Sequence, residues 1–118
     1  MRIILFLKFI YRIIKYLLGS TKRYSFLLFS VFKTRPSSII EIGVYNGNRA
    51  IELIETAKIF NKQVEYYGFD LFEEFYETKN RIKIELSKFP LSKKDIQNKL
   101  NKLAKIRLLK GDTKKTLP

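Results

Sequence analysis

Two glycines and two acids are the residues of this chain whose types and spacing suggest chemistry. Gly43 and Gly47 bracket a short polar turn, and Glu41 stands two residues before the first glycine. Glycine lets the backbone approach a ligand, and a helix that begins after such a turn offers unpaired N–H groups to a negative group. Asp70 follows Gly43 by 27 residues, where an acid can accept hydrogen bonds from ribose hydroxyls. This spacing predicts a nucleotide site, and an ordinary surface loop with a surface Asp is the alternative.

The order of the glycines distinguishes between kinds of nucleotide site. A dinucleotide-binding loop has the pattern G-x-G-x-x-G, but Tyr45 stands where its second glycine would be. A P-loop ends in Gly-Lys-Ser or Gly-Lys-Thr, and neither tripeptide occurs in the chain. Glu41 belongs to neither pattern. A nicotinamide-type site is therefore the weaker alternative.

Three stretches resemble motifs of class I S-adenosylmethionine-dependent methyltransferases, in the order in which that family has them. Residues 41–47 are similar to the family pattern acid-x-Gly-x-x-x-Gly. Residues 67–73 and 110–118 resemble the second-strand acid motif and the segment after the third strand in a bacterial subgroup that includes sugar and macrolide O-methyltransferases. The resemblance covers residues 37–118 and implies S-adenosylmethionine as the cofactor.

The resemblance also implies a role for each matching residue. Gly43 and Gly47 would let the loop pass beneath the methionine part of the cofactor, and Glu41 would hold that loop and the cofactor's amino group. Asp70 would bind the ribose hydroxyls, and Asp112 would lie near the adenine. Together with Tyr45 of the same loop, the candidate cofactor-binding residues are Glu41, Gly43, Tyr45, Gly47, Asp70 and Asp112.

One residue departs from the family pattern. Near position 49 the family often has a small hydroxyl residue, whereas this chain has Arg49. A guanidinium here can meet the cofactor carboxylate, but we expect Arg49 to point to solvent as the helix begins. No catalytic residue and no metal ligand is predicted, because the adjacent Glu73 and Glu74 would face different ways on a helix.

The activity that the resemblance implies is methyl transfer to an oxygen or nitrogen nucleophile by in-line displacement, helped mainly by positioning. The subgroup makes a small-molecule or saccharide hydroxyl the expected acceptor. The family continues with further strands beyond the third, and this sequence ends at Pro118. We therefore expect a fragment that is inactive alone, with the acceptor site in the missing part. The alternative is a catalytically inactive basic module that binds membranes or other partners.

A strand–helix–strand order must position these residues. Strands are expected at residues 37–45, 64–69 and 106–109, and helices at residues 49–60 and 93–105. The first strand reads as a buried strand, and Ser92 with Asp95 resembles a capping box before the second helix. Helical crossovers dictate a parallel sheet. The expected fold is α/β, an incomplete Rossmann-like three-layer sandwich with three strands, in which Ile39–Val44 would be an open edge.

Residues 1–35 are expected to form a basic helical segment before a partial methyltransferase domain at residues 36–118. In residues 1–18, Lys8, Arg12 and Lys15 lie within about 60° of one another on a helical wheel. These bases count against a spanning helix and a signal peptide. Two alternatives stay open: contact with a membrane surface or second subunit, and packing on the domain with the bases outward. A second helix is expected at residues 24–32.

The charge of the chain restricts its partners. Twenty-four Lys and Arg against eleven Asp and Glu give a net charge of +13, which favours anionic partners. Nucleic acid is not expected, because no aromatic residues are interleaved with the lysines of residues 93–115. The absence of Cys and His excludes disulfides, ordinary zinc sites and imidazole-dependent triads. We expect a cytoplasmic protein, with a peripheral contact to the inner face of the membrane as an open alternative.

Overall fold

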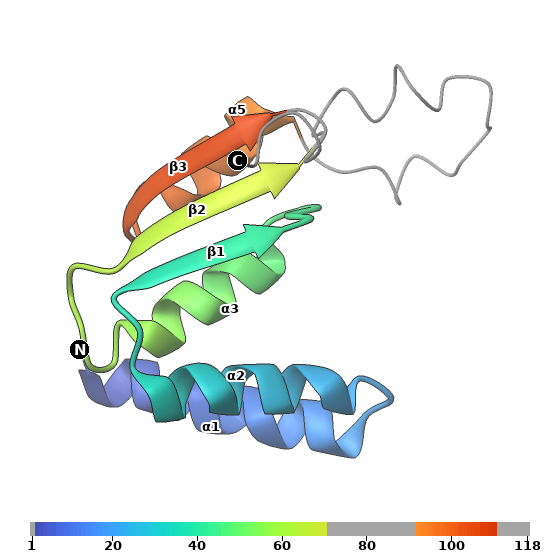
Figure 1. Cartoon of the computed structure of the whole chain (residues 1–118). Helices are drawn as coiled ribbons and strands as arrows, with labels where there is room; N and C mark the ends of the chain where they lie inside the picture. Colours follow the sequence, from blue (N-terminus) through green and yellow to red (C-terminus); the bar gives the residue numbers. More distant parts are fainter. Residues whose placement is uncertain (1, 71–91, 111–118) are drawn as a thin grey trace, which may run out of the picture.

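A three-stranded parallel sheet is at the centre of the structure. The computed structural model describes residues 2–70 and 92–110 (Figure 1). The strands are β1 (Ser38–Ile42), β2 (Glu65–Asp70) and β3 (Lys105–Lys110), hydrogen-bonded in the order β1-β2-β3. Both pairs are parallel, so that Ile39, Tyr66 and Ile106 lie side by side across the sheet. The predicted incomplete Rossmann-like α/β fold is confirmed.

Two helices connect the strands and cover one face of the sheet. Helix α3 (Asn48–Ala57) joins β1 to β2, and α5 (Lys93–Leu100) precedes β3. Right-handed crossovers that run in the same direction place such helices on the same face. The N-cap of α5 is the predicted one, since the Ser92 hydroxyl accepts from the Asp95 N–H at 3.2 Å. The helix ends five residues earlier than expected because Lys105 must already pair with Glu65 in the sheet.

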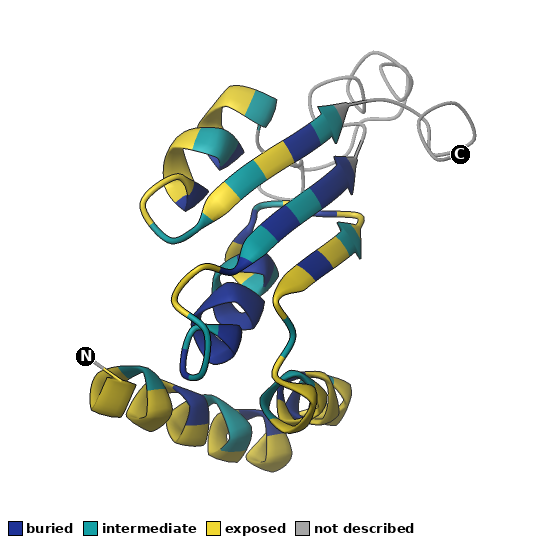
Figure 2. Ribbon diagram, turned by 60° about the vertical axis from the view of Figure 1, so that its left-hand side comes forward, coloured by how far each residue is buried: buried dark blue, intermediate teal, exposed yellow. Residues whose placement is uncertain are grey.

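The opposite face of β1 is exposed, so the prediction that residues 37–45 form a fully buried strand is wrong. Alternate residues of a strand point to opposite faces. Ile39 faces the helices and is buried, whereas Ile40 and Ile42 keep 67% and 61% of their surface exposed (Figure 2). The strand is also shorter than predicted, because Gly43 has a φ of 86° and leaves the sheet. Among the described strands β1 is an edge strand, as expected.

The N-terminal segment is an antiparallel helical pair that packs against α3. Helices α1 (Arg2–Leu18) and α2 (Lys22–Thr34) lie side by side beneath α3 in Figure 1. Stacked rings join them, since Phe9 and Phe32 lie 4.5 Å apart, and Phe32 lies 5.1 Å from Phe60 after α3. Both predicted helices are confirmed. No helix of the described residues is both long and apolar enough to span a bilayer.

A single apolar core runs from α1 to β3. It combines the buried side of the sheet with the inner faces of all four described helices. Its fully buried large side chains are Tyr66, Leu28, Ile54, Ile96, Leu100, Val44 and Val64. Gly68 lies within this core, and a Cβ there would come 2.7 Å from Val44 and 3.0 Å from Leu108. The position therefore has no room for a side chain.

Two basic residues of α1, Lys8 and Arg12, form ion pairs with α3. Lys8 donates to a Glu55 oxygen at 3.0 Å, and Arg12 donates to the other Glu55 oxygen at 2.8 Å and approaches Glu52 at 3.7 Å. Glu52 and Glu55 are buried on α3. The alternative that α1 packs on the domain is therefore confirmed. The accompanying expectation that its basic side chains point outward is wrong for Lys8 and Arg12. Two buried acids on α3 explain the difference, because buried charges require partners.

Acid is expected to weaken the attachment of α1. Burial raises the pKa of Glu55, but hydrogen bonds from Arg12 and Lys8 outweigh it and hold the pKa below its ordinary value of 4.5. Because the folded pKa is lowered, the stabilisation is complete above pH 4.5 and is lost as the pH falls through the folded pKa. Urea unfolding at a series of pH values measures this loss. An equal acid dependence in wild type and Glu55→Gln would contradict the assignment.

Candidate functional site

A glycine loop (residues 43–47) leaves the carboxyl end of β1 and leads directly into α3. Three of its residues have positive φ: Gly43 at 86°, Tyr45 at 54° and Gly47 at 82°. The Gly43 N–H donates to the Phe69 carbonyl at 2.8 Å, and the Gly47 N–H donates to the Val44 carbonyl at 3.0 Å. The first bond holds the start of the loop beside β2, and the second closes a tight turn. Together they place the loop at the carboxyl ends of two parallel strands, where open α/β sheets bind ligands.

A cavity of about 460 Å³ lies over this loop. Three predicted residues line it together: Glu41, Gly43 and Tyr45. The start of α3 and one side of α2 complete its wall, through Asn48, Arg49, Tyr24 and Leu27. The structure thus brings half of the predicted cofactor residues to one cavity. The contribution of α2 was not predicted, since nothing in residues 22–34 marks them as ligand-binding.

The two glycines of the loop differ in what surrounds them. A Cβ on Gly43 would meet no atom within 4 Å, so this glycine supplies a positive φ and an open approach to the backbone. A Cβ on Gly47 would lie 3.2 Å from Ile96 of α5. Gly47 is buried and does not line the cavity, and its φ of 82° turns the chain into α3. Its place in the structure is thus a packing position between the loop and α5.

Glu41 lies at the junction of the sheet and the cavity. Its side chain is half-buried on β1, opposite Gly68 of β2, and its carboxylate accepts a hydrogen bond from the Tyr66 hydroxyl. Tyr66 was not predicted to take part, although the alternation of residues 64–69 places it on the same face as Gly68. This hydrogen bond orients the carboxylate at the cavity wall.

One predicted strand-end acid, Asp70, lies at this edge of the sheet. Asp70 is the last residue of β2, one position after Phe69, whose carbonyl receives the Gly43 N–H. The backbone of Asp70 is therefore beside the glycine loop, as the prediction requires. Asp112 lies outside the described residues, as do Glu73 and Glu74. Within the described ranges, no group of acids could hold a metal ion.

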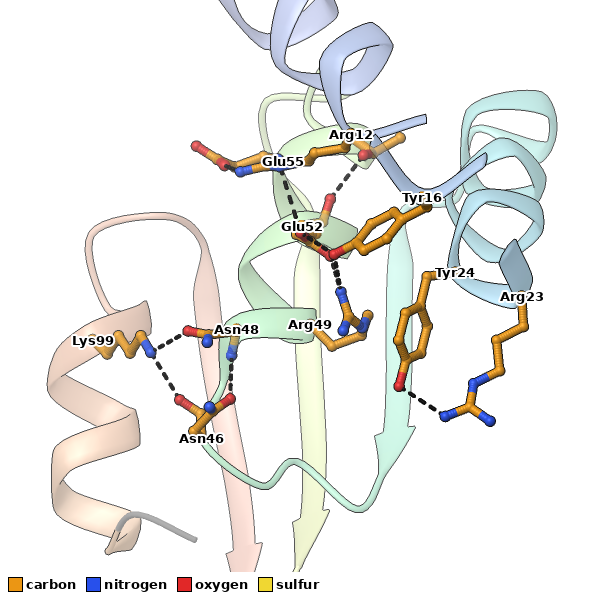
Figure 3. Close-up of polar contacts among 11 residues, drawn as sticks. Arg12, Tyr16, Arg23, Tyr24, Asn46, Asn48, Arg49, Glu52, Glu55 and Lys99 are labelled. Carbon is orange, nitrogen blue, oxygen red and sulfur yellow. Dashed lines mark hydrogen bonds and ion pairs between the residues drawn. The ribbon is translucent and has the colours of Figure 1, made fainter. Parts of the chain in front are cut away.

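Arg49 does not point to solvent, so that prediction is wrong. Its guanidinium carbon lies 3.6 Å above the ring of Tyr24 and 5.2 Å from that of Tyr16 (Figure 3). It also donates to the Tyr16 hydroxyl and forms an ion pair with Glu52. Burial lowers the pKa of Arg49, but the charge of Glu52 and the bond to Tyr16 outweigh it and raise the pKa above its ordinary value. Arg49 therefore joins α1, α2 and α3 at the cavity wall.

Arg49 also lines a second cavity between the N-terminal helices and α3. This space is likewise about 460 Å³, and Tyr24, Asn48 and Arg49 line both cavities. Its other walls include Arg12, Lys15 and Glu52. The shared side chains thus lie between the two cavities. The N-terminal helices are therefore part of the surroundings of the candidate site.

Polar contacts from α5 hold the other side of the loop. The Asn46 side chain accepts from the Asn48 N–H at 3.0 Å, which is an Asx-type turn at the start of α3. Lys99 donates to the Asn46 carbonyl at 2.9 Å and to the Asn48 side chain at 2.6 Å (Figure 3). Lys99 belongs to the lysine-rich stretch of residues 93–115, and its contact with the loop was not predicted. Its side chain is exposed but also connects α5 to the loop across more than fifty residues of sequence.

Sheet, loop and helices together define a Rossmann-like α/β fold with a ligand-sized cavity at the carboxyl end of β1. The crystal structure of the SAH-bound Podospora anserina methyltransferase PaMTH1 is similar, with a TM-score of 0.53 and 18% sequence identity. The match covers 84% of this chain and 36% of that chain, so this chain spans little more than a third of the similar protein. No protein-family model and none of the curated proteins matches the sequence. At this identity the similarity shows the fold.

Proposed function

We propose that this chain is the cofactor-binding part of an S-adenosylmethionine-dependent methyltransferase. The observation that carries the proposal is the convergence of Glu41, Gly43 and Tyr45 on one cavity at the start of α3, beside the strand that ends in Asp70. An S-adenosylmethionine-type ligand needs such a combination: open backbone beneath it, N–H groups at a helix start, and acids for its amino group and hydroxyls. The similarity to an SAH-bound methyltransferase supports the same ligand class.

The residues at the cavity suggest how the ligand would be held. Glu41, oriented by Tyr66, would pair with the amino group, and Asp70 would accept from the ribose hydroxyls. A guanidinium has five N–H donors, so Arg49 would retain donors for the ligand carboxylate while bound to Tyr16 and Glu52. Asp112 would lie near the adenine. The cofactor would supply the methyl group, and the protein would contribute mainly positioning.

The proposed acceptor is a small-molecule or saccharide hydroxyl. The support for it is the resemblance of residues 67–73 and 110–118 to the sugar and macrolide O-methyltransferases. The described residues contain no imidazole or thiol. A base for the acceptor hydroxyl would therefore have to be a carboxylate, a lysine, a tyrosine or a residue outside this sequence.

Titration calorimetry with S-adenosylmethionine and S-adenosylhomocysteine tests the proposal. We expect both to bind wild type, and Asp70→Ala to bind about 10- to 100-fold more weakly, because it loses charge-assisted hydrogen bonds to the ribose. Asp95→Ala removes an exposed acid from α5 and is the matched control, with unchanged binding. Absence of binding, or equal weakening in both variants, would contradict the proposal.

The same titration separates the alternatives. A nicotinamide-type domain would bind NAD in preference to S-adenosylmethionine, whereas Tyr45 occupies the place of the second glycine that such a loop requires. A catalytically inactive basic module would bind neither ligand. The positive φ of Gly43 and its open Cβ direction are compatible with a ligand that approaches the backbone of the loop.

A further inference from the structure

The outward surface of the N-terminal helices is apolar. On α1 eight exposed apolar residues form a continuous arc of about 140° on a helical wheel. Leu18 keeps 84% of its surface exposed and Ile3 keeps 73%. We call this surface the apolar face; its residues are Ile3, Ile4, Leu7, Ile10, Tyr11, Ile14, Leu17 and Leu18 of α1 and Phe26 and Phe29 of α2. Figure 2 shows the exposed side of both helices directed away from the sheet.

The charges around the apolar face are all positive. Residues 1–35 contain eight bases and no acid. Lys8 and Arg12 are turned inward to Glu52 and Glu55. The remaining six basic side chains are all exposed: Arg2, Lys15, Lys22, Arg23, Lys33 and Arg35. The face is therefore a wide apolar surface that carries exposed cations and no anion.

We propose that the apolar face docks on a bilayer surface rich in anionic phospholipid. Apolar side chains would enter the boundary of headgroups and acyl chains, and the exposed cations would attract lipid phosphates. The ion pairs to α3 orient α1 lengthwise along the domain, so that it lies in the plane of the interface. The inward turn of Lys8 and Arg12 contributes to this surface, because it leaves the outward arc of α1 without a charged residue.

Repulsion between like charges argues against a second copy of this chain as the partner that covers the apolar face. An isologous contact brings the same surface of both copies together. Here it would oppose exposed cations to exposed cations with no acid in either helical pair to neutralise them. Like charges across an interface are unfavourable, whereas an anionic bilayer complements both the apolar arc and the bases.

The docked orientation would bring the candidate site close to the bilayer. Phe26 and Phe29 belong to the same helix as Tyr24 and Leu27, which line the cavity over the glycine loop. A helix with its side chains is about 10 Å across, so the cavity would lie about one helix diameter from the headgroups. Docking and cofactor binding remain separate properties, since the apolar-face residues of α1 do not line either cavity at the glycine loop.

Vesicle sedimentation with the full chain tests the inference. We expect binding to phosphatidylcholine vesicles that contain about 30% phosphatidylglycerol, weak binding to pure phosphatidylcholine, and a large loss at about 0.5 M salt. The double variant Leu7→Gln/Ile14→Gln should bind at least about tenfold more weakly, because two apolar side chains no longer enter the interface. Circular dichroism would verify that the variant is folded.

The sheet provides a matched control. Ile40→Gln/Ile42→Gln changes two equally exposed apolar residues on the open face of β1 and should leave vesicle binding unchanged. The inference is overturned if both double variants lose binding equally, or if binding is independent of phosphatidylglycerol. It is also overturned if sedimentation velocity shows a dimer that Leu7→Gln/Ile14→Gln dissociates while wild type ignores the vesicles.

Discussion

Glu55→Gln is expected to lower the free energy of unfolding by about 3 kcal/mol, since removal of one partner from a buried ion pair leaves the other charge uncompensated. Glu55 accepts from both Lys8 and Arg12 and keeps only 6% of its surface exposed. The Arg12 side chain keeps 16% of its surface exposed and would retain only its longer approach to Glu52, at 3.7 Å. The expected loss is at the lower end of the usual range because Glu52 remains. Urea unfolding followed by circular dichroism measures the change.

Two further measurements separate the ion pairs from general damage to α3. Lys8 is about half exposed, so Lys8→Ala should cost less than about 1 kcal/mol. Hydrogen exchange in Glu55→Gln should accelerate in the amides of α1 more than in those of β2 and β3, because α1 loses its attachment first. A double-mutant cycle with Arg12→Ala should show coupling between residues 12 and 55. If the effects of the two substitutions on stability were additive, Glu55 would stabilise α3 without coupling to Arg12.

Gly68→Ala is expected to destabilise the fold by about 2–3 kcal/mol. The added Cβ would lie 2.7 Å from a methyl group of Val44, and 3.0 Å from side-chain atoms of Leu108 and Tyr66. These neighbours are buried and cannot move without opening the core, and overpacking of this kind costs about 1–3 kcal/mol. The displacement of Val44 and Tyr66 should also disturb the glycine loop and Glu41. Urea unfolding gives the loss of stability, and calorimetry shows whether ligand binding weakens with it.

Gly19→Ala is the matched control for this substitution. Gly19 is exposed between α1 and α2, and the nearest atom to an added Cβ is a backbone oxygen at 3.4 Å. The same chemical change should therefore be neutral or slightly stabilising, because alanine reduces the freedom of the unfolded chain. Equal destabilisation by both substitutions would show that close packing at Gly68 is not the cause.

Local patterns were sufficient to predict the elements of the fold. The strand candidate at residues 64–69, the helical spacing in residues 49–60 and the glycines of the loop are properties of short stretches, and each led to the element that the structure contains. Positive φ occurs at Gly43 and Gly47, where glycine allows it, and also at Tyr45. The roles predicted for Asp70 and Asp112 in ligand binding stay predictions. The predicted ends of the helices and strands were less accurate, because strand pairing decides where β3 begins.

Contacts between distant residues decided the remaining features. The sequence by itself determined that α1 is amphipathic with a basic stripe, and that Arg49 stands at the start of a helix. Only the tertiary structure decided that Lys8 meets Glu55, 47 residues away, and that Arg49 meets Tyr16, 33 residues away. The physical reason is that helical periodicity defines faces but not their partners. The buried acids on α3 required cations, and so turned Lys8 and Arg12 of α1 inward and the apolar arc of this helix outward.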